Sequence, residues 1–283
     1  MSDMTSGLVA VPGARIHYEV RGTGPVLLVL QGGEGDAGRT GGLVNGLVDE
    51  YTVVTYDRRG LSRSTVDDPS AELTMETHAD DVHRLLAAVT AGPAILLGSS
   101  LGGLIGLSVA IRHPDQVGTL VTHEPPAVRL LPEPARALSE RVFDGLEETY
   151  RTEGWGAAFT KLAEITGGAT EDREPDAELP APLSRERIAN MHFFFTHDIP
   201  AIRRCRLEAA DVIALKAASV RVVPAAGRAS RRGFFDYRCA EELARLLGVA
   251  MVEFPGGHNG LTTHPKAFAV RLREVLRAPR DYS

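Results

Sequence analysis

The chain has 283 residues, of which 43% are hydrophobic and 24% are charged, and its formal net charge is -6. This length allows one large α/β domain or two smaller domains, with a substantial buried core. The acidic excess argues against a nucleic-acid partner, because a surface that binds phosphate groups usually carries an excess of basic side chains.

The cysteines and the N-terminus indicate where the protein resides. Cys205 and Cys239 are the only cysteines, and they form neither a metal-ligand spacing nor a framework of several pairs. The first 13 residues lack the basic region and long apolar run of a secretory signal. We therefore expect a reduced, cytoplasmic protein. The spacing of histidines, cysteines and carboxylates suggests no metal or organic cofactor.

Short apolar runs alternate with helical patterns along the chain. Two β-rich runs on either side of Pro12-Gly13 predict a hairpin. Further apolar runs, bounded by glycine or charged residues, predict strands at 25–30, 51–57, 93–98, 118–124, 220–227 and 249–257. Helical patterns cover 75–89, 240–248 and 264–276. This alternation indicates an α/β fold with a largely parallel sheet covered on both faces.

The alternation stops between Pro125 and about Val212, where proline-rich joints separate helix-like segments. We interpret this interval as an all-helical insertion between two strands, which forms a lid over one edge of the sheet. The predicted division is a core domain of residues 1–125 and 213–283 and a helical cap of residues 126–212.

Residues 93–111 carry no charge and are nearly long enough to span a bilayer at about 20 residues. Glycines and serines in the middle of this run would weaken a helix there. We therefore predict a buried strand and a buried helix that meet at a sharp turn. The turn, Gly98-Ser99-Ser100-Leu101-Gly102, fits the G-x-S-x-G pattern of a nucleophile elbow, with Ser100 as the nucleophile.

A serine hydroxyl needs a base that takes its proton. His258 is the best candidate among the nine histidines, because it lies in a glycine-rich loop directly after the last predicted strand. Open α/β sheets place their sites at the carboxyl ends of strands. The bland alternative for the turn is a glycine-containing bend without chemistry.

Four phrases together resemble the α/β-hydrolase superfamily. They are the elbow, the glycine loop "QGGEGD" (31–36), "YDRRGLSRS" (56–64) and the late "PGGH" (255–258). The resemblance covers nearly the whole chain. It implies an eight-stranded, mostly parallel sheet, a helical cap inserted after strand six, and a Ser-acid-His triad. Fold resemblance implies neither the substrate nor, by itself, activity.

The triad acid departs from the superfamily pattern. Ala229 stands where an aspartate would be expected after the seventh strand. Glu124, at the end of the sixth strand, is a replacement, and its phrase "HEPP" resembles the zearalenone-lactonase group, whose triad uses the corresponding glutamate. This resemblance implies a triad of Ser100, Glu124 and His258. Asp236 is the competing acid if a long loop reaches back, and loss of a functional acid is the third alternative.

The superfamily resemblance also suggests the oxyanion hole, made by the N–H of Leu101 and by Gly32 and Gly33 as candidate second donors. A phosphate cradle is disfavoured at this loop, because no Walker lysine follows it. In the insertion, three consecutive aromatic residues cannot all face one side of a helix. Aromatic side chains in the insertion are candidates for a substrate pocket, namely Trp155, His192, Phe194 and Phe195.

The expected function is that of a cofactor-independent serine hydrolase that cleaves a small hydrophobic ester or lactone. A zearalenone-like macrolactone is the sharpest version of this expectation. An acyl-transferring biosynthetic enzyme is the alternative within enzymes, and a small-molecule-binding protein on an impaired hydrolase scaffold is the alternative outside them. We expect no nucleic-acid or membrane partner, and the sequence leaves a homodimer open.

Overall fold

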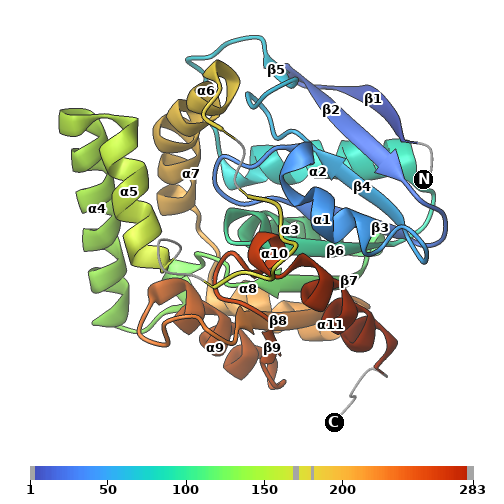
Figure 1. Ribbon diagram of the computed structural model, residues 1–283. Coiled ribbons are helices and arrows are strands. Elements are labelled where there is room, and N and C mark those ends of the chain that lie inside the picture. Colours follow the sequence, from blue (N-terminus) through green and yellow to red (C-terminus); the bar gives the residue numbers. More distant parts are fainter. Residues whose placement is uncertain (1–3, 168–171, 180–181, 279–283) are drawn as a thin grey trace.

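A single mixed sheet organises the molecule (Figure 1). The computed structural model describes residues 4–167, 172–179 and 182–278. Eight strands follow the order β1-β2-β4-β3-β6-β7-β8-β9, and the short β5 (Thr65–Val66) pairs with β2. The eight are β1 (Thr5–Val11), β2 (Ala14–Arg21), β3 (Val26–Leu30), β4 (Thr52–Tyr56), β6 (Ala94–Ser99), β7 (Val117–His123), β8 (Arg221–Gly227) and β9 (Val252–Phe254).

The pairing confirms the expected mostly parallel sheet, to whose eight strands the short β5 adds a ninth. β1 and β2 form the predicted antiparallel hairpin, and β2 pairs with β4 in the antiparallel sense. The neighbouring strands from β4 through β3, β6, β7 and β8 to β9 all pair in the parallel sense. Their carboxyl ends therefore meet at one edge, which is where an open α/β sheet places its site.

Alternating side chains of each central strand build two cores. Leu28 and Leu30 of β3 pack on one face with α2 (Met75–Val89), α3 (Leu101–Arg112) and α9 (Phe235–Leu247). Leu27 and Val29 pack on the other face with α1 (Gly41–Asn45) and α11 (Pro265–Arg277). This two-residue period and the apolar nature of both faces are the signs of a sheet covered on both sides.

The helical interval between β7 and β8 stands at one end of the sheet (Figure 1). α4 and α5 lie outermost, and α6 and α7 lie between them and the strands. The elements are α4 (Ala135–Glu153), α5 (Trp155–Thr166), α6 (Arg185–Phe193), the π-helix η5 (Phe194–Asp198), α7 (Ile199–Arg204) and α8 (Ala209–Ala214). The division into core and cap domains stays a prediction, and its ranges include residues 1–3, 168–171, 180–181 and 279–283, outside the described part.

Two predicted elements differ from the structure. α9 begins at Phe235, five residues before the helical pattern starts, because aromatic side chains with modest helix propensity form its first turn. β9 covers only Val252–Phe254 of the expected 249–257. Pro255 follows immediately and has no N–H for the strand ladder, so the strand ends there.

The uncharged stretch 93–111 is divided as predicted, with β6 ending at Ser99 and α3 beginning at Leu101. Among residues 4–167, 172–179 and 182–278, no helix combines the length and apolarity needed to cross a bilayer. Ser100 is the single residue between the two elements, at the carboxyl edge of the sheet.

Candidate active site

Ser100 has the backbone of a strained turn. Its φ of 52° and ψ of -123° place a non-glycine residue at positive φ, which is costly and recurs at functional sites. The turn is possible because glycines stand two residues before and two residues after Ser100. A Cβ at Gly102 would lie 1.9 Å from the carbonyl oxygen of Leu30, and one at Gly98 would lie 2.4 Å from that of Gly102. The glycines therefore serve the close approach of β6, α3 and β3.

Glu124 and His258 lie beside each other at the same edge. Glu124 follows β7 with a φ of 47°, and its Oε2 is 2.7 Å from Nδ1 of His258. Its Oε1 accepts a hydrogen bond from the N–H of Gly227, at 2.9 Å. Glu124 therefore reaches the end of the next strand, β8, where the superfamily pattern would have its aspartate. A proton on Nδ1 leaves the lone pair of His258 on Nε2.

The surroundings of Glu124 decide its charge. Burial is the largest single influence and would raise the pKa of this fully buried carboxyl, but the hydrogen bond from His258 and the charges of His123 and His258 together lower the pKa to about 2. Glu124 is thus a carboxylate throughout the neutral range. A buried carboxylate on Nδ1 can orient the imidazole and stabilise its protonated form.

Asp236 approaches the same imidazole from the other nitrogen. Its Oδ2 lies 3.8 Å from Nε2 of His258, and its Oδ1 is buried without a hydrogen-bond partner among the described residues. Burial raises the pKa of Asp236 to about 8, although His258 acts in the opposite direction. The expected alternative acid does reach back to His258, but it is neutral at neutral pH and lies on the Nε2 side.

Arg58 shapes the loop that faces Ser100. Its fully buried guanidinium donates to the carbonyl oxygens of Gln31, at 3.0 Å, and of Gly33. The same group forms an ion pair with Asp198, at 3.0 Å. A Cβ at Gly32 would lie 2.8 Å from the carbonyl oxygen of Ser99, so this loop passes directly over the elbow.

A cavity of about 290 Å³ connects these groups. Ser100, His258 and Asp236 line it, together with Gly32 and Gly33 of the expected oxyanion loop. Leu101, the expected third member of the hole, is buried at the first position of α3, where a helix N–H has no partner within its own helix. The opposite wall is apolar and comes from α4, α5, η5, α7 and α9, with Phe143, Leu146, Phe159, Leu162, Phe194, Ile199, Ile202 and Phe235.

Among the four side chains expected in the substrate pocket, Phe194 alone lines this cavity. Phe195 stacks on Tyr150, and Trp155 and His192 meet edge to face at 6.4 Å. The pocket expectation is therefore corrected for Trp155, His192 and Phe195: Trp155 contacts His192, and both His192 and Phe195 contact Tyr150 of α4. The three consecutive aromatic residues diverge as expected, because Phe193 stacks on His197 and Phe195 stacks on Tyr150, while Phe194 lines the cavity.

Several residues of the cavity have no sequence signal of their own. Arg39, Arg173 and Arg187 line it, and they come from three separate segments. In the phrase "YDRRGLSRS", Arg59 pairs with Asp81 at 2.6 Å. Arg58 pairs with Asp198, which is 140 residues away in the sequence. The one usable signal was an arginine inside a phrase that resembles the superfamily.

Comparison with known proteins agrees with the fold. Residues 25–154 match a family model described as the α/β hydrolase fold. The hydrolase YraK of Bacillus subtilis (strain 168) is 39% identical over 284 residues, which cover 99% of each chain. A thermophilic esterase from Thermogutta terrifontis has a TM-score of 0.70 at 24% identity, over 96% of this chain and 98% of that one. An enol-lactonase from Burkholderia xenovorans LB400 has a TM-score of 0.66 at 22% identity, over 96% and 100%.

Proposed function

Because the chain belongs to the α/β-hydrolase family, we propose that it hydrolyses a carboxylic ester or lactone through an acyl-enzyme intermediate on Ser100. The observation that carries this proposal is the 2.7 Å contact between Glu124 and His258, because His258 lines one cavity with the strained Ser100. It supplies the acid that the seventh-strand phrase lacks. The intact pair of residues also argues against the alternative of a binding protein with lost catalysis.

In the proposed reaction, Oγ of Ser100 bonds to the carbonyl carbon of the substrate while its proton passes to Nε2 of His258. Glu124 stabilises the imidazolium that forms. The imidazolium then protonates the leaving alkoxide as the carbon–oxygen bond breaks. Water next attacks the acyl carbon and gives a proton to His258. The bond between the acyl carbon and Oγ of Ser100 then breaks while the imidazolium returns this proton to Oγ, which releases the acid and restores Ser100. In a lactone the leaving alkoxide stays attached, so the product is a hydroxy acid.

The tetrahedral intermediate carries a negative oxygen, and the proposed donors are the N–H of Leu101 and an N–H from Gly32 or Gly33. Arg58 supports this role because it binds two carbonyl oxygens of the same loop and so fixes the loop's backbone. Such preorganised donors contribute on the order of 10²–10³ in rate each.

The apolar wall of the cavity supports a hydrophobic acyl or alcohol group. The fold neighbours include an esterase and an enol-lactonase, which are compatible with this substrate class. Membership of the zearalenone-lactonase-like group, with a neutral macrolactone as substrate, stays a finer proposal that rests on the Glu124 and His258 phrases. An acyl-transferring enzyme would use the same residues with another acceptor in place of water.

The test is mass-spectrometric detection of a fluorophosphonate adduct, together with hydrolysis of a short p-nitrophenyl ester. We expect an adduct on Ser100 in the wild type, none on Ser100→Ala, and strongly slowed labelling of Glu124→Gln. Ser99→Ala is the matched control, because Ser99 precedes the nucleophile and should leave the adduct on Ser100. Absence of an adduct on the wild type would contradict the proposal and favour a binding protein.

A further inference from the structure

Three arginines stand on the boundary between the cavity that contains Ser100 and a second cavity of about 320 Å³. Arg39 comes from the 3-10 helix η1 (Ala37–Thr40), Arg173 from the segment after α5, and Arg187 from α6. All three line both cavities. We call the cavity that contains Ser100 the inner cavity and the second one the outer cavity. A ligand that spans both cavities would lie beside all three arginine side chains.

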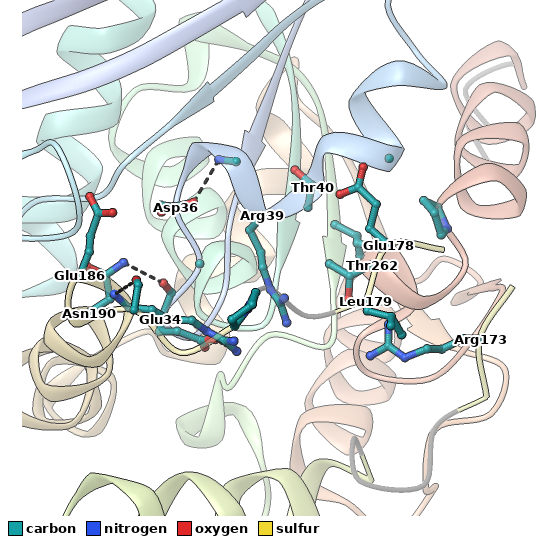
Figure 2. A pocket seen from close by; sticks show the side chains of 18 residues that line it. Glu34, Asp36, Arg39, Thr40, Arg173, Glu178, Leu179, Glu186, Asn190 and Thr262 are labelled. Atoms are coloured by element: carbon teal, nitrogen blue, oxygen red, sulfur yellow. Dashed lines mark hydrogen bonds and ion pairs between the residues drawn. The ribbon is translucent and has the colours of Figure 1, made fainter. Parts of the chain in front are cut away.

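The side chains of Arg39 and Arg173 converge on one opening (Figure 2). They reach into it from opposite sides, and both residues are half-buried. Burial lowers the pKa of Arg39, and the neighbouring charges of Arg187 and Arg173 lower it further, while Glu34 raises it. Like charges are thus held close enough to repel one another at this place.

Two carboxylates that line the outer cavity, Glu34 and Asp36, have partners other than Arg39 and Arg173. Glu34 pairs with Arg187 at 3.0 Å. Asp36 accepts from the N–H of Gly38 at 3.1 Å and from the hydroxyl of Ser62 at 2.7 Å.

Glu178 points away from the two arginines (Figure 2), and its oxygens lie 3.8 and 3.9 Å from the position that a Cβ on Gly41 would take. Within the described ranges, neither Arg39 nor Arg173 has a carboxylate within ion-pair distance.

A cation that is partly withdrawn from water without a counter-ion is costly, and an anion bound there would relieve the cost. The planar guanidinium matches a carboxylate with two parallel hydrogen bonds, which makes arginine the usual side chain for this recognition. Much of the remaining wall of the inner cavity is apolar, and Ser100 lies in the same cavity. An occupant of both parts would be an amphipathic ester with one anionic end.

We propose that Arg39 and Arg173 bind a carboxylate of the substrate, so that the enzyme prefers esters or lactones that carry a carboxylate several bonds away from the reacting carbonyl. This inference rests on the proposed function and deepens it, because it names the substrate class. It also distinguishes this chain from an enzyme that cleaves a neutral macrolactone, because a neutral macrolactone has no carboxylate that the arginines could bind.

The experiment compares p-nitrophenyl hexanoate with two carboxylated relatives. In mono-p-nitrophenyl adipate a carboxylate replaces the terminal methyl of the acyl chain, and in the hexanoate of a carboxylated nitrophenol it lies on the leaving group. We expect the wild type to prefer one carboxylated ester by roughly 10- to 100-fold in kcat/KM, the range of a charge-assisted hydrogen bond. The preference should weaken with added salt.

Arg39→Gln and Arg173→Gln should each remove most of this preference, chiefly through KM, and Arg39→Lys should restore part of it. The readout is the ratio of kcat/KM for two esters on the same variant, so that a general loss of activity cancels. Arg15→Gln, at an exposed position of β2, is the matched control and should keep the wild-type ratio.

Equal kcat/KM for charged and neutral esters in the wild type would overturn the carboxylate site while leaving the hydrolase intact. If no ester is cleaved and Ser100 is not labelled, the proposed function fails instead. Calorimetric titration with adipate then tests the site alone. Binding to the wild type that is weakened in Arg39→Gln supports the site, and absence of binding overturns it.

Discussion

Two buried carboxyl groups flank one imidazole, and their surroundings give them opposite charge states. Glu124, at the end of β7, has a partner for each oxygen: Nδ1 of His258 and the N–H of Gly227. Asp236, in the first turn of α9, has neither partner and stands 3.8 Å from Nε2. The pKa is about 2 for Glu124 and about 8 for Asp236. Both carboxyl groups are buried, so burial does not explain the difference between their pKa values. The hydrogen bonds that Glu124 accepts favour its charged form, and Asp236 lacks these bonds.

The largest expected effect comes from neutralising the ionised member of the pair. Glu124→Gln should keep the fold but lower kcat by roughly 10⁴-fold, because a neutral amide neither stabilises the imidazolium nor holds the correct tautomer. Steady-state kinetics with circular dichroism as the folding check measure this. If turnover stays at the wild-type level, Glu124 is not the acid.

The second effect tests whether Asp236 replaces Glu124 as the triad acid when Glu124 is neutralised. The double variant Glu124→Gln/Asp236→Asn should retain the residual activity of Glu124→Gln, because a neutral carboxyl on the Nε2 side cannot stabilise the imidazole through Nδ1. Single-turnover rates of the two variants at pH 7 make the comparison. A further large loss in the double variant would show that Asp236 takes over.

A smaller, pH-dependent effect should come from Asp236 alone. As the pH rises through about 8, Asp236 ionises 3.8 Å from Nε2, holds a proton on His258 and places a negative charge in the cavity where the oxyanion develops. The kcat/KM of the wild type should therefore fall several-fold between pH 7 and pH 9.5. Asp236→Asn should lack this step, and an unchanged pH profile in that variant would contradict the assignment.

The smallest effect concerns stability. The pKa of Asp236 is raised in the folded state, from the ordinary 3.8 to about 8, so the folded protein binds more protons than the unfolded chain between these values. The contribution of Asp236 to the free energy of unfolding is therefore fully present below about pH 4 and is lost as the pH rises toward 8. Asp236→Asn should raise Tm by a few degrees at pH 8.5 and by less at pH 5. Calorimetric scans at both pH values test the sign, with Asp236→Leu as a second uncharged variant.

The sequence was sufficient where function follows from local pattern. Apolar runs that alternate with helical patterns predicted the parallel sheet, and the glycines around Ser100 predicted the turn. Both features depend on residues that are close together in the sequence. The departure at Ala229 directed attention to Glu124, whose side chain now reaches the end of β8. Arg39 and Arg173 could not be predicted, because an isolated arginine in a polar segment is typical of a solvated surface. Their convergence depends on how the segment after α5 packs against the loop after β3.

The bond between Arg58 and Asp198 limits how the helical interval can be exchanged. Recombination of this interval with that of a relative is an attractive route to new specificity, because much of the cavity wall comes from it. Asp198 lies inside the interval, whereas Arg58 and its other partner segments lie outside. A graft without an acidic residue at this position would leave a wholly buried cation unpaired and release the loop above the elbow. Chimeras of this fold should therefore be designed with Asp198 retained, whatever substrate they are meant to accept.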